Sequence, residues 1–253
     1  MIGVINTQDK RYDNLINNLQ DVIYSNKLTD FNDLDVLVLP LNGVDAFLFI
    51  KDTNLNVMDF YIKKGPKKII AGKINQELID FCKNEEIELT SYLEDECYLW
   101  ENSKLTSEAL IKKILYDLDD ALYKKRLLIL GYGYQAKALY NYLSPFTNNI
   151  AIYASDYHDK KELFCKNIER NDLTDLNFDI IINTVPYNII DEKNLNLIND
   201  KCLIYDVASY PYGFSEECLK KIKITVLPKL PSLYMPKKAG EILASYILNI
   251  IKQ

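Results

Sequence analysis

Short runs of apolar residues alternate along the chain with longer amphipathic stretches. The apolar runs are rich in Val, Ile and Leu and contain few charged residues. Uninterrupted apolar runs separated by helical stretches predict parallel strands that are covered by helices on both faces of a sheet. The pattern therefore predicts an α/β protein. The expected strands are residues 2–5, 35–40, 67–72, 87–92, 126–131, 149–155, 178–186, 202–209 and 223–228.

Two of these runs, residues 2–5 and 127–130, each open a unit of strand, turn and helix. A length of 253 residues suits two ordinary domains. We therefore expect two doubly wound parallel-sheet, Rossmann-like domains with an interdomain cleft. The expected division is a substrate or lid domain at 1–102, an interdomain helix at 103–123, an NAD(P)-binding domain at 124–237, and a final helix at 238–253 that packs back on the first domain.

Residues 103–122 carry leucine and isoleucine at helical spacing on one face. We predict that this helix joins the two domains. Thr106 is expected to be its N-cap, and Glu108 lies in the expected first turn, where the helix dipole favours a carboxylate.

The composition is that of a globular protein, with 48% hydrophobic and 26% charged residues. A formal charge of -6 and the lack of a dense basic stripe argue against nucleic acid as a partner. No apolar stretch approaches the ~20 residues that cross a bilayer, and the N-terminus does not read as a leader. We expect a cytoplasmic protein that does not bind membranes.

Histidine and cysteine offer little for catalysis or metal binding. The one histidine, His158, lies in a polar stretch typical of a surface turn, and the five cysteines lack metal-ligand spacing. The sequence therefore argues against mechanisms that need a histidine base, and we expect no metal site.

Residues 127–139, LLILGYGYQAKAL, contain the clearest chemical signal. Gly131, Gly133 and Ala136 form a G-x-G-x-x-A pattern between a strand and a helix. In dinucleotide-binding folds these positions give a tight turn, close approach to the pyrophosphate and close helix packing. The other reading is a β-to-α turn without a ligand. The predicted cofactor loop is Gly131, Tyr132, Gly133, Tyr134, Gln135 and Ala136.

The next strand ends at Ser155 and Asp156. An acidic residue there binds a ribose hydroxyl and favours NAD, whereas basic residues accommodate the 2′-phosphate of NADP. Because Lys160 and Lys161 follow closely, the cofactor is predicted only as NADP or NAD.

Small and polar residues follow two later strands, where ligands of open α/β sheets bind. Ordinary turn chemistry would give the same residue types. The predicted nicotinamide contacts are Asn183, Thr184, Val185, Pro186 and Ala208, and Ser209 and Tyr210 follow directly.

The blocks GYGYQA, INTVP, DVASYPYG and LPKLPSLYMPKKAGEILA, in this order, resemble the A subunits of dipicolinate synthase. The resemblance extends more weakly through the first half. Asn6 and Thr7 replace a double glycine of that family, and Leu105 and Ala109 replace a proline and a glycine, so the chain reads as a divergent member.

The resemblance implies an oxidoreductase of endospore formation, on a branch of the diaminopimelate and lysine pathway. Its substrate would be 4-hydroxy-tetrahydrodipicolinate, which becomes dipicolinate as NADP or NAD accepts hydride. It also implies that the partner is a flavoprotein-like B subunit. A homo-oligomer is compatible with this picture.

A dicarboxylate substrate needs cationic or hydrogen-bonding groups. Lys237, which matches a lysine of the family, is the first candidate, and Arg11, expected in the loop after the first strand, is the second. Ser209, Tyr210 and Thr106 are further substrate-binding candidates. Lys237, Ser209 and Glu108 are the catalytic candidates for proton transfer.

Two other functions stay open. One is another two-domain dehydrogenase, similar to shikimate or hydroxyacid dehydrogenases. The other is a nucleotide-binding scaffold or regulatory subunit without turnover of its own. This function is favoured by Asn6, Thr7 and Ala136, where the chain departs from the pattern of the family.

Overall fold

The computed structural model describes residues 1–154, 169–170 and 173–252. By its internal contacts the chain divides into two compact units, Met1–Asn102 with Pro231–Gln253, and Ser103–Leu230. Each unit is built on one sheet, and the long helix α4 (Glu96–Asp117) carries the chain from the first unit into the second.

The first unit contains a five-stranded parallel sheet in the order β2-β1-β3-β4-β5. This is the flavodoxin-like strand order, in which β2 is added on one side of β1 and the later strands β3, β4 and β5 on the other side. Its strands are β1 (Ile2–Ile5), β2 (Val22–Ser25), β3 (Val36–Val38), β4 (Lys68–Ala71) and β5 (Glu88–Ser91). Its helices are α1 (Lys10–Leu15), η1 (Ile16–Asn18), η2 (Leu28–Asp30), α2 (Val57–Lys64), α3 (Gln76–Asn84) and α8 (Pro236–Lys252), and α7 (Leu230–Tyr234) leads into α8.

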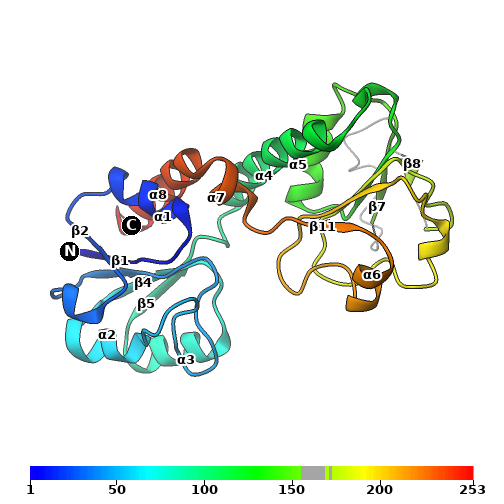
Figure 1. Ribbon diagram of the computed structural model, residues 1–253. Coiled ribbons are helices and arrows are strands. Elements are labelled where there is room, and N and C mark those ends of the chain that lie inside the picture. The colour runs from blue at the N-terminus through cyan, green and yellow to red at the C-terminus, as the bar shows by residue number, and fades with distance from the viewer. Residues whose placement is uncertain (155–168, 171–172, 253) are drawn as a thin grey trace. The chain divides into compact units, whose positions relative to one another are not determined.

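Helices cover both faces of this sheet, with α1 and α8 on one side and α2 and α3 on the other (Figure 1). Successive residues of β3 serve opposite faces, since Leu37 packs with α2 and α3 whereas Val36 and Val38 pack with α1 and α8. A Cβ atom on Gly240 of α8 would lie 2.6 Å from the carbonyl oxygen of Arg11, so only glycine permits this close packing of α8 on α1.

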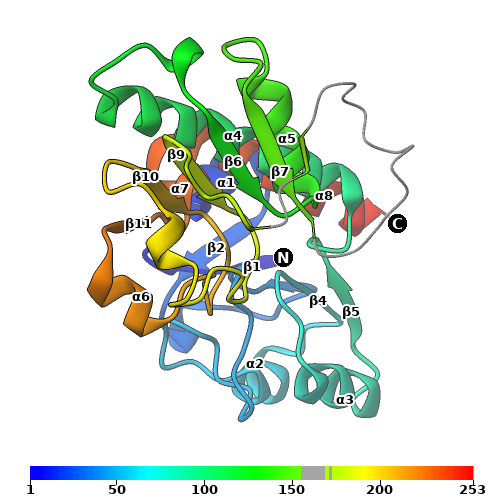
Figure 2. The same ribbon diagram turned by 90° about the vertical axis from the view of Figure 1, so that its right-hand side faces the viewer.

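The second unit contains a six-stranded parallel sheet in the order β11-β10-β9-β6-β7-β8. When the strands are numbered 1 to 6 from β6 to β11 and the sheet is read from β8, this is the order 3-2-1-4-5-6 of dinucleotide-binding sheets. Figure 2 shows β6 between β9 and β7. The strands are β6 (Leu127–Leu130), β7 (Ile150–Tyr153), β8 (Glu169–Arg170), β9 (Ile180–Asn183), β10 (Leu203–Asp206) and β11 (Ile224–Val226), and the helices besides α4 are η3 (Leu122–Lys124), α5 (Tyr134–Leu143), η4 (Leu195–Leu197) and α6 (Glu216–Lys221).

The predicted fold class, α/β with two doubly wound parallel sheets, is confirmed. Two strands were not expected. One is β2, an edge strand whose four residues, VIYS, are all only half-buried, so it is not one of the buried apolar runs. The other, β8, is two residues long.

The predicted start of the joining helix is wrong. The helix α4 begins at Glu96, and the side chain of Asp95 accepts a hydrogen bond from the backbone N–H of Tyr98 at 2.9 Å, as an N-cap does. Thr106 therefore lies inside the helix and is buried. Glu108 is likewise well past the first turn.

Candidate cofactor and active site

The first glycine of the loop after β6 is fixed by its backbone and its neighbours. Gly131 has a φ of 111°, a conformation that other residues rarely adopt. A Cβ atom at this position would lie 2.4 Å from Oγ1 of Thr184. Gly131 thus allows the end of β6 to lie directly against the loop that follows β9.

The second glycine has a different environment. Gly133 is the N-cap of α5 and is extended, with φ -79° and ψ -171°, which any residue can adopt. Apart from its two chain neighbours, no heavy atom of the described residues would lie within 4 Å of a Cβ atom added here. The protein itself therefore does not require a glycine at this position, and open space lies in front of the helix.

The N-terminus of α5 presents backbone donors to that space. Its first helical bond runs from the N–H of Lys137 to the carbonyl of Gly133 at 3.0 Å, and among the described residues no side chain caps it. The N–H groups of Tyr134, Gln135 and Ala136 thus have no acceptor within the helix. By contrast, α1, α2, α3 and α6 each have a capping side chain, namely Asp9, Asn56, Asn75 and Ser215. An uncapped N-terminus behind two glycines fits a pyrophosphate group.

The side chains of the loop point in several directions. Ala136 is buried, as the close packing of α5 on the sheet requires. Gln135 donates a hydrogen bond from Nε2 to Oγ of Ser107 in α4 at 3.2 Å, so its side chain is used for helix packing. The ring of Tyr132 lies 4.8 Å from Nζ of Lys137. The groups suited to a phosphate are therefore backbone groups.

A buried hydrogen-bond network joins the ends of β9 and β10. Asn183 and Asp206 are fully buried, and Nδ2 of Asn183 donates to Oδ1 of Asp206 and to the carbonyl of Val185, both at 2.9 Å. Oδ1 of Asp206 also accepts from the N–H of Ala208 at 3.0 Å, and Oδ2 from the N–H of Gly213 at 2.8 Å. Three donors thus satisfy a carboxylate that has no cation beside it among the described residues.

This network fixes the shape of both loops. A Cβ atom on Gly213 would lie 1.9 Å from Nδ2 of Asn183, so the glycine is required for closure. Thr184 donates from Oγ1 to the carbonyl of Leu130 at 2.7 Å, which ties the loop after β9 to the end of β6. The sequence indicated that Asp206 ends the strand before Ala208, Ser209 and Tyr210, but neither Asp206 nor Gly213 was among the predicted site residues. The available signal was an aspartate that directly ends a buried strand and precedes a glycine-bearing turn.

The exposed part of this edge carries the remaining candidates of the second unit. Pro186, Ser209 and Tyr210 are exposed. The backbone turns between Ser209 and Tyr212, where the N–H of Tyr212 donates to the carbonyl of Ser209 at 2.9 Å. The rings of Tyr210 and Tyr212 meet edge to face at 5.9 Å. Fold and network thus bring the loops at 131–136, 183–186 and 206–213 to one edge of the sheet.

The candidates on α4 are occupied within the protein. Thr106 is buried inside the helix. Glu108 is exposed, and its Oε1 accepts a hydrogen bond from the hydroxyl of Tyr142 in α5 at 2.7 Å. This bond joins two helices of the second unit.

Arg11 lies in the first unit, and its expected position in a loop is wrong. It occupies the first turn of α1 and is only 2% exposed. Its guanidinium donates from Nη1 to the hydroxyl of Tyr98 at 3.2 Å, and Nη2 lies 3.7 Å from Asp9. Burial raises the pKa values of the surrounding tyrosines Tyr12, Tyr92 and Tyr98, so these phenols stay neutral. Such an arginine has little surface for a substrate.

Lys237 also belongs to the first unit. It is the second residue of α8 and is exposed, and the adjacent Lys238 forms an ion pair with Glu241 at 3.3 Å. Ser155, Asp156 and His158 lie outside the described residues.

Within the described part of the chain, no group of three or more His, Cys, Asp or Glu residues is arranged to hold a metal ion. Among the same residues, no helix is both long and apolar enough to cross a membrane.

The strand order and the glycine loop define the class as a two-domain, Rossmann-like α/β fold. D-lactate dehydrogenase with NAD+ from Lactobacillus jensenii superposes with a TM-score of 0.58 at 12% identity, over 99% of this chain and 95% of that one. No protein-family model matches the chain.

The particular protein that the chain resembles is the A subunit of dipicolinate synthase, which the sequence blocks indicated. The protein of this name from Bacillus subtilis (strain 168) is 25% identical over an alignment of 237 residues, and the match covers 88% of this chain and 80% of the relative. The crystal structure of the A subunit of dipicolinate synthase from Bacillus halodurans superposes with a TM-score of 0.83 at 20% identity, over 100% of this chain and 98% of that one.

Proposed function

We propose that the chain is an NAD(P)-dependent oxidoreductase that converts 4-hydroxy-tetrahydrodipicolinate to dipicolinate. In total the substrate would lose one water molecule, a hydride to the oxidised cofactor and a proton to solvent, which leaves an aromatic pyridine dicarboxylate. The observation that carries the proposal is the uncapped N-terminus of α5 behind Gly131 and Gly133, in a sheet of dinucleotide-binding order. Similarity to one of the dipicolinate synthase subunits supports the choice of substrate.

We assign the pyrophosphate to the N–H groups of Tyr134, Gln135 and Ala136. Open space in front of Gly133 supports this assignment, because the phosphate must approach the backbone there. The cofactor, when bound, supplies a hydride acceptor. Whether it is NAD or NADP depends on the end of β7, where we keep Ser155 and Asp156 as the candidates.

We assign the nicotinamide end to the loops after β9 and β10. The side chain of Asn183 donates a hydrogen bond to Asp206, and that of Thr184 donates one to the carbonyl of Leu130. We therefore assign these two residues the role of holding the loops in shape. The surface left for the ring belongs to the half-buried Val185 and the exposed Pro186, whereas Ala208 is buried and its N–H donates to Asp206. Such a preorganised wall costs no rearrangement when the ligand binds.

For the substrate we assign one carboxylate to Lys237, whose exposed ammonium lies at the start of a long helix. Ser209 and Tyr210 supply hydroxyl groups for orientation or proton transfer. Glu108 and Arg11 are assigned indirect roles, since each already has partners within its own unit. Thr106 is assigned to helix packing.

We further propose that the chain works with a different, second subunit. The relative from Bacillus subtilis is named for one subunit of its synthase, which supports this. A flavoprotein-like B subunit, work in the cytoplasm and a role in sporulation belong to the same proposal.

The test is incubation of the purified chain with freshly generated 4-hydroxy-tetrahydrodipicolinate and either NAD or NADP, with and without a candidate second subunit. Dipicolinate absorbance and reduced-cofactor absorbance should rise together, one molecule of each per turnover. Cofactor binding without product from this substrate would favour another dehydrogenase. Absence of both binding and product would favour a scaffold.

A further inference from the structure

A second cavity lies at the opposite edge of the same sheet. Arg126 directly precedes β6, Asn149 directly precedes β7 and Phe178 lies just before β9, so the cavity faces the amino ends of these parallel strands. Its volume is about 420 Å³, within the range of about 300–1,000 Å³ typical of small-molecule sites. It is lined by Lys124, Arg126, Asn148, Asn149, Ile150, Ala151 and Phe178.

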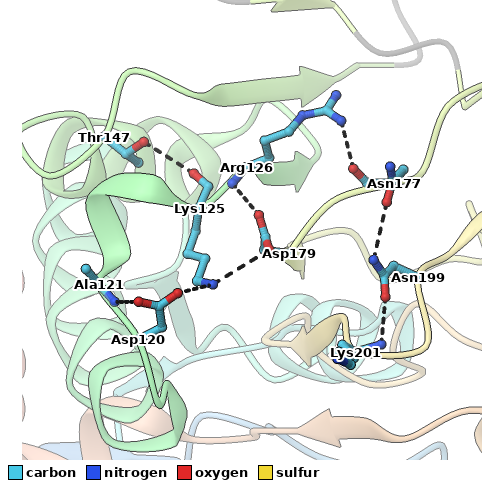
Figure 3. Close-up of polar contacts among 9 residues, drawn as sticks. All are labelled: Asp120, Ala121, Lys125, Arg126, Thr147, Asn177, Asp179, Asn199 and Lys201. Atoms are coloured by element: carbon cyan, nitrogen blue, oxygen red, sulfur yellow. Dashed lines mark hydrogen bonds and ion pairs between the residues drawn. The ribbon is translucent and has the colours of Figure 1, made fainter.

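Two basic side chains, Lys124 and Arg126, line this cavity. Of three consecutive basic residues, Lys125 points away and lies 2.8 Å from Asp120 and 3.9 Å from Asp179 (Figure 3). Among the described residues Lys124 has no ion pair, and its ammonium lies 5.6 Å from the ring of Tyr123. The cavity thus has two lining cations, in a protein whose net charge is -6.

The guanidinium of Arg126 is held in place before any ligand arrives. Nη1 donates to the carbonyl of Asn177 at 2.9 Å, and Nη2 lies 3.3 Å from Asp175 (Figure 3 shows the bond to Asn177). The group also lies over the ring of Phe178, 4.8 Å from its centroid. The ion pair with Asp175 is half-exposed and therefore weak, so a ligand anion can share this cation.

The rest of the lining suits a flat ligand with acceptor groups. Asn148 and Asn149 are exposed and carry amide donors, whereas Ile150, Ala151 and Phe178 form a buried apolar floor. Cations and amides at the rim above an apolar floor match a ring that bears anionic substituents.

We propose that this cavity is a second binding site, for a small ring compound that carries carboxylate or phosphate groups. It is separate from the glycine loop, which lies at the carboxyl ends of the same strands. It does not depend on the proposed reaction, although the product of that reaction has the required chemistry.

The test uses the full chain and calorimetric titration with three probes: pyridine-2,6-dicarboxylate, adenosine 5′-monophosphate and inorganic phosphate. At least one ring compound should bind at low salt, and more weakly as salt is added. Binding of the dicarboxylate alone identifies a carboxylate ligand, and binding of the nucleotide alone identifies a phosphate ligand. No binding by either ring compound overturns the proposal.

Variants separate the two sites. Lys124→Ala should weaken binding about tenfold, the usual effect of one charge-assisted hydrogen bond, and Lys124→Arg should restore most of it. Lys201→Ala is the matched control, because Lys201 is exposed and outside the cavity lining. Gly133→Val should leave this affinity unchanged. Equal affinity in Lys124→Ala, or loss of binding in Gly133→Val, would place the ligand elsewhere and refute the site.

Discussion

Replacing Gly133 by valine separates the ligand-binding role of the glycine loop from its role in folding. The backbone at this position is extended, and an added Cβ atom meets no described residue within 4 Å besides its chain neighbours. Stability should therefore change only through the weaker N-cap preference of valine, which costs about 1 kcal/mol. A loss of that size lowers the melting temperature by about 2–4 °C in a protein of this length.

Binding should suffer far more than folding. The two methyl groups of valine would occupy the space in front of the N–H groups of Tyr134, Gln135 and Ala136. A charge-assisted hydrogen bond contributes about 1.5–3 kcal/mol, so the loss of two costs about 3–6 kcal/mol. Since about 1.4 kcal/mol corresponds to a factor of ten, the Kd for NADH or NADPH should rise at least about 100-fold.

The assay is titration of the full chain with NADH or NADPH, followed by cofactor fluorescence, beside a thermal denaturation curve. Gly131→Ala is the informative comparison, because its Cβ would clash with Thr184 at 2.4 Å and its φ of 111° disfavours alanine. That variant should lose stability as well as affinity. If Gly133→Val binds the cofactor within threefold of the unmodified chain, the pyrophosphate does not lie at this helix.

Three further substitutions test the assignments around the site. Asp206→Asn places an amide N–H₂ group against the N–H of Gly213 or against Asn183, which costs about 1–3 kcal/mol of folding free energy. The melting temperature should therefore fall by about 2–12 °C, whereas Asp200→Asn, at an exposed position, should leave it unchanged. Glu108→Gln can still accept from Tyr142, so turnover should stay within about threefold; a 100-fold loss of kcat would instead make Glu108 catalytic. Lys237→Ala should raise the KM for the dicarboxylate about tenfold and Lys238→Ala should not; equal KM values would move the carboxylate site.

Much of the fold could be predicted because parallel strands buried on both faces read as uninterrupted apolar runs. All nine expected strands are present, from β1 to β11. Two strands of the structure were not predicted: β2, which is a half-buried edge strand, and β8, which has only two residues. The start of α4 was misplaced because Ser and Thr inside a helix resemble an N-cap, while the capping residue Asp95 lies farther back.

The site was predictable where backbone chemistry leaves a sequence pattern, and less so where tertiary contacts decide. The spacing of the two glycines predicted a tight turn after β6, and Gly131 has the positive φ that such a turn requires. The burial of Arg11 against Tyr98 could not be predicted in this way, because this contact joins residues that are 87 positions apart in the chain. The turn of Gln135 towards Ser107 likewise depends on how α5 packs against α4.

The most direct test of the account is a crystal structure of the chain with NADH or NADPH bound. The account predicts that the pyrophosphate oxygens lie within hydrogen-bond distance of the N–H groups of Tyr134, Gln135 and Ala136, with the nicotinamide against the loops at 183–186 and 206–213. A dinucleotide bound anywhere else, or its absence at saturating concentration, would contradict it.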